Sequence, residues 1–173
     1  MALAKQLRER LTVPAFAAPM FLCSGVELAT ECCKAGIVGS LTRNHCRDLA
    51  ELEVQLKVVS GALARCADEY PGRTIGPLAV NITPTFGLDE MKAHLEVCRR
   101  YGVHIVVTSV GDPTVNAPLI KDAGILHFHD ATTIRFAEKA AAAGVDGVVA
   151  IGAGGGGVAD VIYTRGVNGL PAS

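Results

Sequence analysis

The chain alternates short apolar stretches with longer amphipathic ones, and it does so six times. The apolar stretches are rich in Val, Ile and Ala and run continuously apolar, which is typical of strands buried on both faces of a parallel sheet. Each is followed by residues with helical spacing, as a right-handed crossover requires. The predicted strands are Val13–Met20, Ile37–Leu41, Pro77–Ile82, Val103–Ser109, Ile125–His129 and Val145–Ile151.

Two α/β architectures satisfy this alternation, a doubly wound open sheet and a TIM (β/α) barrel. A closed TIM barrel has eight strands, so about six parallel strands predict an incomplete one. Ser24 is placed to cap a helix over Gly25–Ala35, which Gly36 ends, and Asp48 is placed to cap a helix running to about Ala67. Further helices are predicted over Leu88–Tyr101, Pro113–Ala123 and Thr132–Ala143.

Composition narrows the possible partners and compartment. The chain has 173 residues and a net charge of −1, so nothing favours nucleic acid or an anionic membrane as a partner. No apolar run reaches the roughly 18 residues of a membrane-spanning helix. The six cysteines are scattered and form no C-x-x-C pair. Scattered thiols in an α/β chain fit a reducing compartment, so we expect a cytoplasmic protein without disulfides.

A glycine run follows the last predicted strand. Residues 152–157 contain five glycines in six positions. Glycines at the end of a strand let backbone N–H groups converge on one anion, because no Cβ blocks the approach. A flexible linker is the alternative interpretation. The run thus makes a phosphate-binding loop a hypothesis that needs support from the other strand ends.

Ligands of parallel α/β proteins bind at the carboxyl ends of the strands. The residues found there offer backbone groups, an amide, hydroxyls and imidazoles, with few carboxylates, which suits a polar planar ligand with a phosphate tail. His127 and His129 face the same way in a strand and could bind a metal together with Asp130, although a structural role for these histidines is favoured. Asn81 is either a ligand contact or a turn residue.

Several segments together resemble the nitronate monooxygenase family, also described as 2-nitropropane dioxygenase-like. The resemblance covers about residues 11–157 and is carried by motifs at successive strand ends and by the glycine run. These motifs are Ala17–Leu22, Ala35–Ser40, Ala79–Asn81, Phe128–Asp130, Ala141–Gly147 and Gly152–Gly157.

The resemblance implies an FMN-dependent TIM barrel that oxidises an alkyl nitronate with O₂. It implies that backbone atoms of Ala18, Pro19 and Met20 lie against the flavin ring and that Asn81 contacts it, with Gly155 and Gly156 near the phosphate or ribityl chain. It also makes Ser109, His129 and Asp130 candidate cofactor-binding residues, and it implies no resident metal. An enoyl-thioester reductase of the same flavin fold remains an alternative, because fold does not fix chemistry.

The sequence departs from the family in two ways. The family continues the glycine run with a histidine read as the base, and this chain has Val158 there, so the catalytic residue is left unknown. Family members are also longer, which suggests an internal deletion near Gly157. We therefore expect residues 1–157 to form the first three-quarters of an FMN-binding barrel and residues 158–173 a tail segment. A non-catalytic remnant that self-associates through open sheet edges is the alternative.

Overall fold

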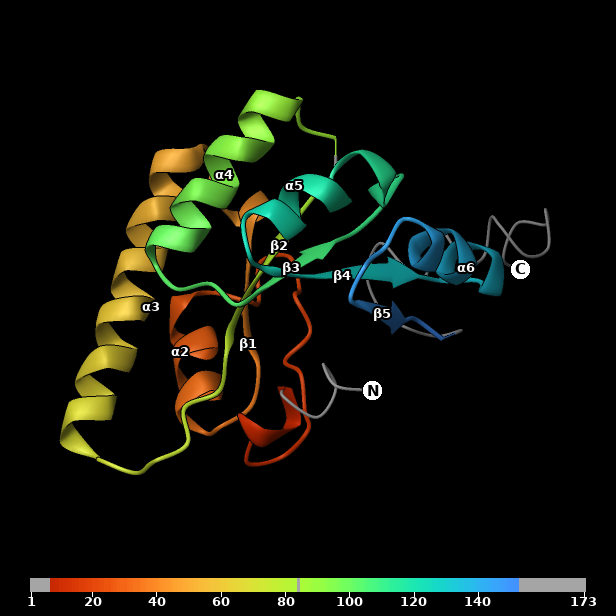
Figure 1. Ribbon diagram of the computed structural model, residues 1–173. Helices are drawn as coiled ribbons and strands as arrows, with labels where there is room; N and C mark the ends of the chain where they lie inside the picture. The colour runs from red at the N-terminus through yellow and green to blue at the C-terminus, as the bar shows by residue number, and fades with distance from the viewer. Residues whose placement is uncertain (1–6, 84, 153–173) are drawn as a thin grey trace, which may run out of the picture.

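The computed structural model describes residues 7–83 and 85–152, and these residues form a parallel sheet with helices on one side (Figure 1). The strands pair in the order β1-β2-β3-β4-β5, which is also their order in the sequence. Every pairing is parallel, so the carboxyl ends of all five strands lie at the same end of the sheet, which we call the carboxyl edge. The strands are β1 (Gly39–Thr42), β2 (Leu78–Ile82), β3 (Ile105–Thr108), β4 (Leu126–Ala131) and β5 (Gly147–Ala150).

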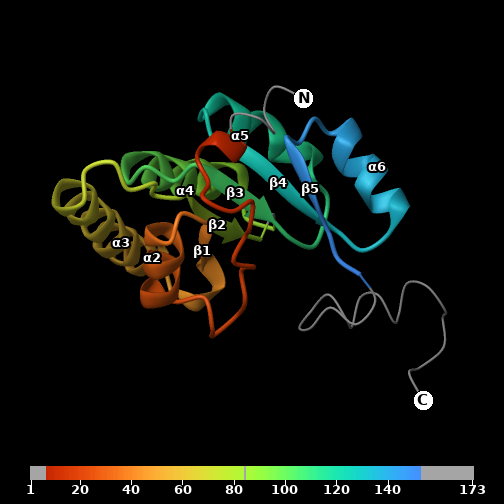
Figure 2. The same cartoon turned by 90° about the horizontal axis from the view of Figure 1, so that it is seen from below.

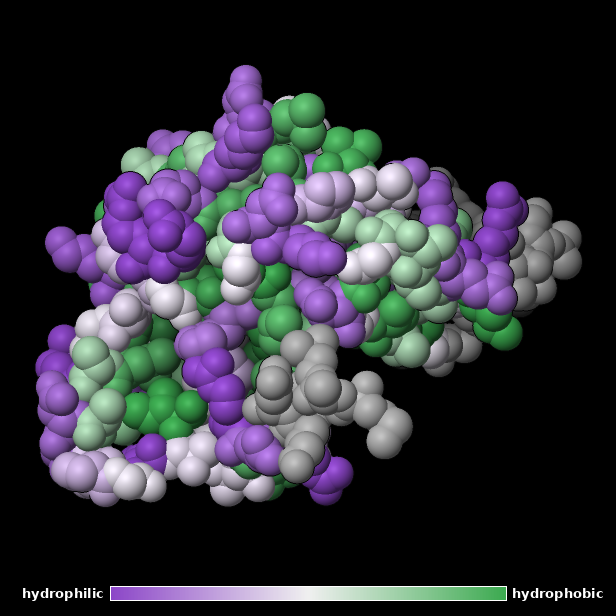
Figure 3. Space-filling view, viewed as in Figure 1, coloured by the Kyte–Doolittle hydropathy of each residue, from purple (hydrophilic) through white to green (hydrophobic). Residues whose placement is uncertain are grey.

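The helices connect successive strands and follow the curve of the sheet, with α2 and α3 at one end of the molecule and α6 at the other (Figures 1 and 2). Hydrophilic side chains gather over α3 and α4 on the face shown in Figure 3, where Arg100 and Glu53 form an ion pair at 2.7 Å. No described helix combines the length and the apolar composition needed to cross a bilayer. The helices are α2 (Val26–Lys34), α3 (Leu49–Glu69), α4 (Leu88–Arg100), α5 (Ala117–Asp122) and α6 (Ile134–Ala142).

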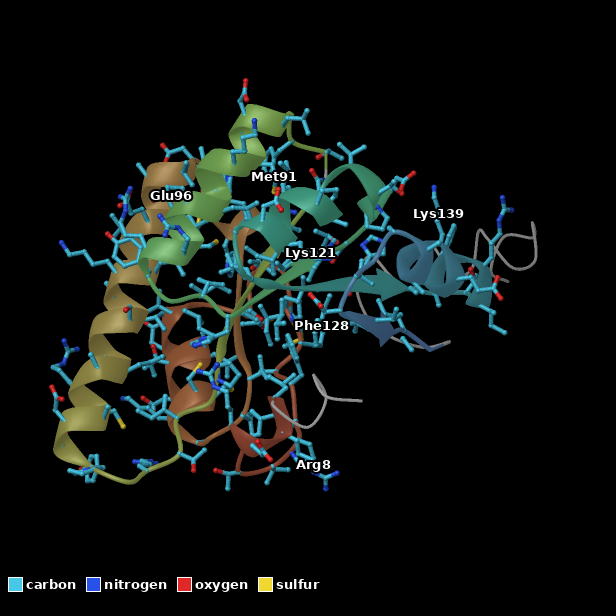
Figure 4. The ribbon with its side chains drawn as sticks, viewed as in Figure 1. Arg8, Met91, Glu96, Lys121, Phe128 and Lys139 are labelled. Carbon is cyan, nitrogen blue, oxygen red and sulfur yellow. The ribbon has the colours of Figure 1, made fainter. Side chains whose placement is uncertain are left out.

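Strands β1, β2 and β3 are buried on both faces, which explains their apolar character, whereas β4 is partly buried and β5 partly exposed. On the outer face, strand side chains such as Leu41 and Val80 pack against helix side chains such as Leu52 and Met91. On the inner face, Val38, Ala79, Ile105 and Val107 form a second cluster, and Phe128 packs against it. Figure 4 shows Met91 on α4 and Phe128 on the sheet. Along each strand, successive side chains therefore point alternately to the outer and the inner face.

The first predicted strand is much shorter than expected. In place of a strand over Val13–Met20, one parallel bridge joins Phe16 to Val38 beside β1. The backbone hydrogen bonds of this bridge run between Ala15, Ala17 and Val38. Pro14 and Pro19 flank the bridge, and because proline has no N–H, neither can extend the ladder. The described sheet thus has five strands and this bridging segment.

The amino ends of the strands are covered on the inner face by the residues that precede this bridge. A helical turn at 7–9 places Leu7 beside the inner cluster, and Phe16 lies 6.4 Å from Phe128 between ring centroids. A cavity of about 450 Å³ remains between this segment and the sheet, lined by apolar side chains and by Arg8 and Asp146. This cavity lies at the end of the sheet opposite to the carboxyl ends.

Helix boundaries follow the predicted caps with two corrections. Asp48 caps α3 by accepting a hydrogen bond from the Glu51 backbone N–H at 2.8 Å, as predicted, and Gly36 ends α2 with a φ of 79°. Ser24 is not the cap of α2, because Gly25 occupies that position. The last helix begins at Ile134 rather than near residue 132, because β4 continues through Ala131.

Candidate functional site

Three polar side chains meet on the inner face at the carboxyl ends of β2, β3 and β4. The Asn81 amide Nδ2 donates to Ser109 Oγ at 2.6 Å and to the Val107 carbonyl oxygen at 3.1 Å. Ser109 Oγ then donates to Asp130 Oδ2 at 2.5 Å. The result is a directed hydrogen-bond chain from an amide through a hydroxyl to a carboxylate.

The sheet register creates this chain. Asn81 pairs with Val107, and Thr108 pairs with His129. Ser109 and Asp130 directly follow Thr108 and His129, so they lie side by side at the carboxyl ends of β3 and β4. Asn81 shares its face with Ala79, and Asp130 shares its face with Phe128, because side chains two residues apart on a strand point the same way. Three residues widely separated in sequence are therefore brought together by strand pairing alone.

The environment of Asp130 favours its protonated form. Burial raises the pKa of its carboxyl group, and the hydrogen bond from Ser109 opposes part of that rise. The side chain is half-buried. Within the described part of the chain, only Oδ2 of this carboxyl has a hydrogen-bond partner, so Oδ1 remains available. Asp130 is thus a fixed carboxyl group that holds a proton more tightly than an exposed one does.

Thr42 adds a polar group beside Asn81. It is the last residue of β1, pairs with Asn81 in the register and points to the same inner face. Its hydroxyl Oγ1 is buried and has no hydrogen-bond partner among the described residues. A buried hydroxyl without a partner lowers the stability of the fold by about 1–3 kcal/mol. A polar group of a ligand could supply the hydrogen bond that the Thr42 hydroxyl lacks.

The segment Ala18–Met20 lies at the same edge, after the Phe16 bridge. Ser24 accepts a hydrogen bond from the Met20 N–H at 2.8 Å and donates to the Ala18 carbonyl oxygen at 3.1 Å. These two backbone groups are therefore already occupied, and Ala18 and Met20 are exposed. The segment offers a largely apolar surface rather than backbone hydrogen bonds.

His129 lies on the opposite face of the sheet from Asp130. His127 and His129 do face the same way, as the strand period predicts, and both are buried on the helix side. Thr108 Oγ1 lies 2.7 Å from His127 Nε2 and 2.7 Å from His129 Nδ1. Across residues 7–83 and 85–152, no three His, Cys, Asp or Glu side chains form a group that could hold a metal ion.

A buried arginine cluster beside β1 was not predicted from the sequence. Arg43 is 7% exposed, donates from Nε to His94 Nε2 at 2.6 Å and lies 5.5 Å from the centroid of the Phe86 ring. Arginine can only donate, so His94 carries its proton on Nδ1, which contacts the Glu90 carbonyl oxygen at 2.7 Å. Burial lowers the pKa of His94, opposed by that carbonyl and reinforced by Arg43. The cluster joins α4 to the end of β1.

The remaining sequence candidates lie outside the described residues. Gly155, Gly156 and Val158 belong to this group, as does the proposed tail over residues 158–173. Their predicted roles stay predictions, and so does the cofactor-binding role of the residues described above.

Comparison with known proteins identifies the fold. FabK from Thermotoga maritima matches over 86% of this chain with 19% identity and a TM-score of 0.63. Rubisco from Pyrococcus horikoshii OT3 matches over 84% with 16% identity and a TM-score of 0.60. DHODH from Eimeria tenella, solved with ferulenol, matches over 80% with 14% identity and a TM-score of 0.54. No family model and no curated protein matches the chain.

The fold is that of an incomplete TIM barrel. The chain spans 43% of the FabK structure, 41% of the Rubisco structure and 49% of the DHODH structure, so it matches under half of each. This confirms the prediction of a partial barrel. At such low identities the likeness establishes the fold only.

Proposed function

We propose that this chain is the flavin-binding part of an FMN-dependent oxidoreductase, with an alkyl nitronate and O₂ as its substrates. The observation that carries the proposal is the Asn81–Ser109–Asp130 chain at the carboxyl edge of a barrel sheet. Ligands of this fold bind at that edge. The nitronate substrate is supported by the sequence resemblance, and the flavin by the resemblance together with the fit of this site.

The described residues fit a planar polar ring system. The exposed Ala18–Met20 segment can hold an aromatic face by apolar contact, and Thr42 Oγ1 supplies a hydroxyl in need of a partner. The edge of a flavin ring carries carbonyl oxygens and ring nitrogens, which match hydroxyl, amide and carboxyl groups. Asn81 and Asp130 supply the last two. His129 is left out of the proposed site, because it lies on the helix side of the sheet.

Each residue of this chain would have a binding or orienting task. Asn81 is anchored to Val107 and orients Ser109, which in turn orients Asp130. The apolar Ala18–Met20 segment excludes water from one side of the site. FMN, when bound, supplies the electron transfer between substrate and O₂.

The direct test is titration of the purified protein with FMN, followed by its visible spectrum and by flavin fluorescence. We expect saturable binding with a shifted flavin spectrum, and nitrite release when an alkyl nitronate is added. Asn81→Leu removes the donor that organises the site and should weaken FMN binding at least tenfold. Lys92→Ala on the outer surface of α4 is the control and should bind FMN as the unaltered chain does.

Three results would contradict the proposal. A protein that binds no FMN at micromolar concentrations supports the non-catalytic alternative. Flavin binding with turnover of an enoyl thioester and none of nitronates supports the reductase alternative. Equal FMN affinity in the Asn81→Leu and Lys92→Ala variants would show that the carboxyl edge is not the binding site.

A further inference from the structure

We propose that a hollow between α2 and α3 binds a phosphate group, either as inorganic phosphate or as a small phosphate monoester. The two helices lie side by side, and the hollow has a volume of about 350 Å³, within the range of small-ligand sites (Figures 1 and 2). Both helices end shortly before the strand that follows them, so the hollow lies at the end of the sheet opposite to the carboxyl edge. Its polar lining consists of Glu31, Lys34, Arg65, Glu69, Tyr70 and Arg73.

Three cationic side chains reach this hollow from different parts of the chain. Lys34 lies in the last turn of α2, and its side chain is 28% exposed. Arg65 lies on α3, and Arg73 belongs to the turn that follows that helix. In this turn the Arg73 backbone N–H donates to the Tyr70 carbonyl oxygen at 3.1 Å, and Gly72 has a φ of 92°. The turn brings Cζ of Arg73 to 5.6 Å from the centroid of the Tyr70 ring, which positions the guanidinium group at the hollow.

The two carboxylates of the hollow already have partners. Glu31 Oε1 accepts a hydrogen bond from Lys34 Nζ at 2.7 Å. The Glu69 carboxylate accepts one from the Tyr70 hydroxyl and thereby raises the pKa of that hydroxyl. Within residues 7–83 and 85–152, by contrast, no ion pair joins Arg65 or Arg73 to a carboxylate. Two arginines therefore line the hollow without an anionic partner from the described part of the chain.

This arrangement favours a compact anion that carries several oxygens. A guanidinium group presents its N–H donors in a planar fork that matches two phosphate oxygens, and such charge-assisted hydrogen bonds are about twice as strong as neutral ones. The cations of the hollow outnumber its carboxylates, so a doubly charged phosphate gains more there than a single carboxylate does. The carbonyl ends of α2 and α3 carry partial negative charge, so the helix dipoles give an anion no help. Binding therefore depends on the arginine side chains.

The test is titration of the full chain with inorganic phosphate at constant ionic strength, followed by calorimetry and by amide NMR shifts. We expect saturable binding to one site, with the shifts concentrated at Arg65 and at residues 70–73. Arg65→Gln and Arg73→Gln should each weaken binding at least tenfold, because each removes a bidentate donor. Arg99→Gln is the matched control, since Arg99 is an exposed arginine on α4 paired with Glu96 at 3.1 Å, and it should bind phosphate as the unaltered chain does.

A second titration with glycerol 3-phosphate distinguishes the two sources of the phosphate group. Tighter binding than that of inorganic phosphate assigns the hollow to a monoester, and equal or weaker binding assigns it to the free anion. Asn81→Leu should leave both affinities unchanged, which separates this site from the proposed flavin site. Three results would overturn the inference: no saturable binding at millimolar phosphate, equal losses in Arg99→Gln and the two hollow variants, or unchanged affinity in both Arg65→Gln and Arg73→Gln.

Discussion

The buried histidines make a quantitative prediction about acid stability. His127 is 2% exposed on the helix side of β4, and its ring Nδ1 has no hydrogen-bond partner within the described residues. Burial lowers its pKa to about 4, His129 adds to the fall, and Asp146 opposes it. Protonation of the ring would bury a charge beside Thr108 with only one ring nitrogen bonded. The folded protein therefore resists a proton that the unfolded chain accepts readily.

The sign and size follow from linkage. The folded-state pKa of His127 lies below its unfolded value of 6.5, so its stabilising contribution is complete above pH 6.5 and is lost as the pH falls toward 4. One pKa unit corresponds to about 1.4 kcal/mol. Between pH 7 and pH 5, His127 alone should lower the free energy of unfolding by about 2 kcal/mol. His94 and His129, whose pKa values burial also lowers, add to this loss.

Urea unfolding at pH 7 and at pH 5 measures the effect. The difference in unfolding free energy between the two pH values should be about 2 kcal/mol smaller in His127→Gln than in the unaltered chain. His45→Gln, which alters a histidine outside the buried pair, is the control and should keep the full difference. An equal pH dependence in His127→Gln and the unaltered chain would refute the reasoning, whatever the absolute stability of the variant.

Three further predictions concern packing, the site and assembly. Thr42→Val removes the unpartnered hydroxyl and should raise the free energy of unfolding in urea by about 1 kcal/mol. The same variant should bind FMN more weakly in a flavin titration. Lower stability of the variant would mean that the hydroxyl already has a partner. Gly39→Ala should destabilise by about 3 kcal/mol in urea, because its Cβ would overlap the Ala29 carbonyl oxygen, whereas Gly87→Ala, with open space around it, should change little. Among the described residues β5 has no strand on its outer side, and this edge should cause concentration-dependent self-association in sedimentation velocity; a monomer at high micromolar concentration would contradict this.

Much of the sheet could be predicted because β1, β2 and β3 are buried on both faces. Continuous apolar runs such as Ile105–Thr108 mark where a strand lies, and parallel order follows from the intervening helices. A continuously apolar strand does not indicate which of its side chains point to the helix side of the sheet and which point to the inner face. The family resemblance made His129 and Asp130 both candidates, and the structure places them on opposite faces of β4.

The meeting of Asn81, Ser109 and Asp130 was only partly predictable. Strand ends are brought to one edge by any parallel sheet, so their proximity follows from the fold. The direction of the hydrogen bonds depends on the register, which the sequence does not specify to within one residue. Ser24 shows a similar limit, because a serine before a helix signals an N-cap, yet its hydroxyl is bonded to the preceding loop.

The Ser24 contacts have a thermodynamic consequence for whatever rests on the Ala18–Met20 segment. The Ala18 carbonyl and the Met20 amide are already satisfied, so a ligand gains little enthalpy from new polar contacts there. Its gain comes from dispersion and from water released by the apolar surface. In calorimetry of ligand binding, burial of the apolar Ala18–Met20 surface should appear mainly as a negative change in heat capacity.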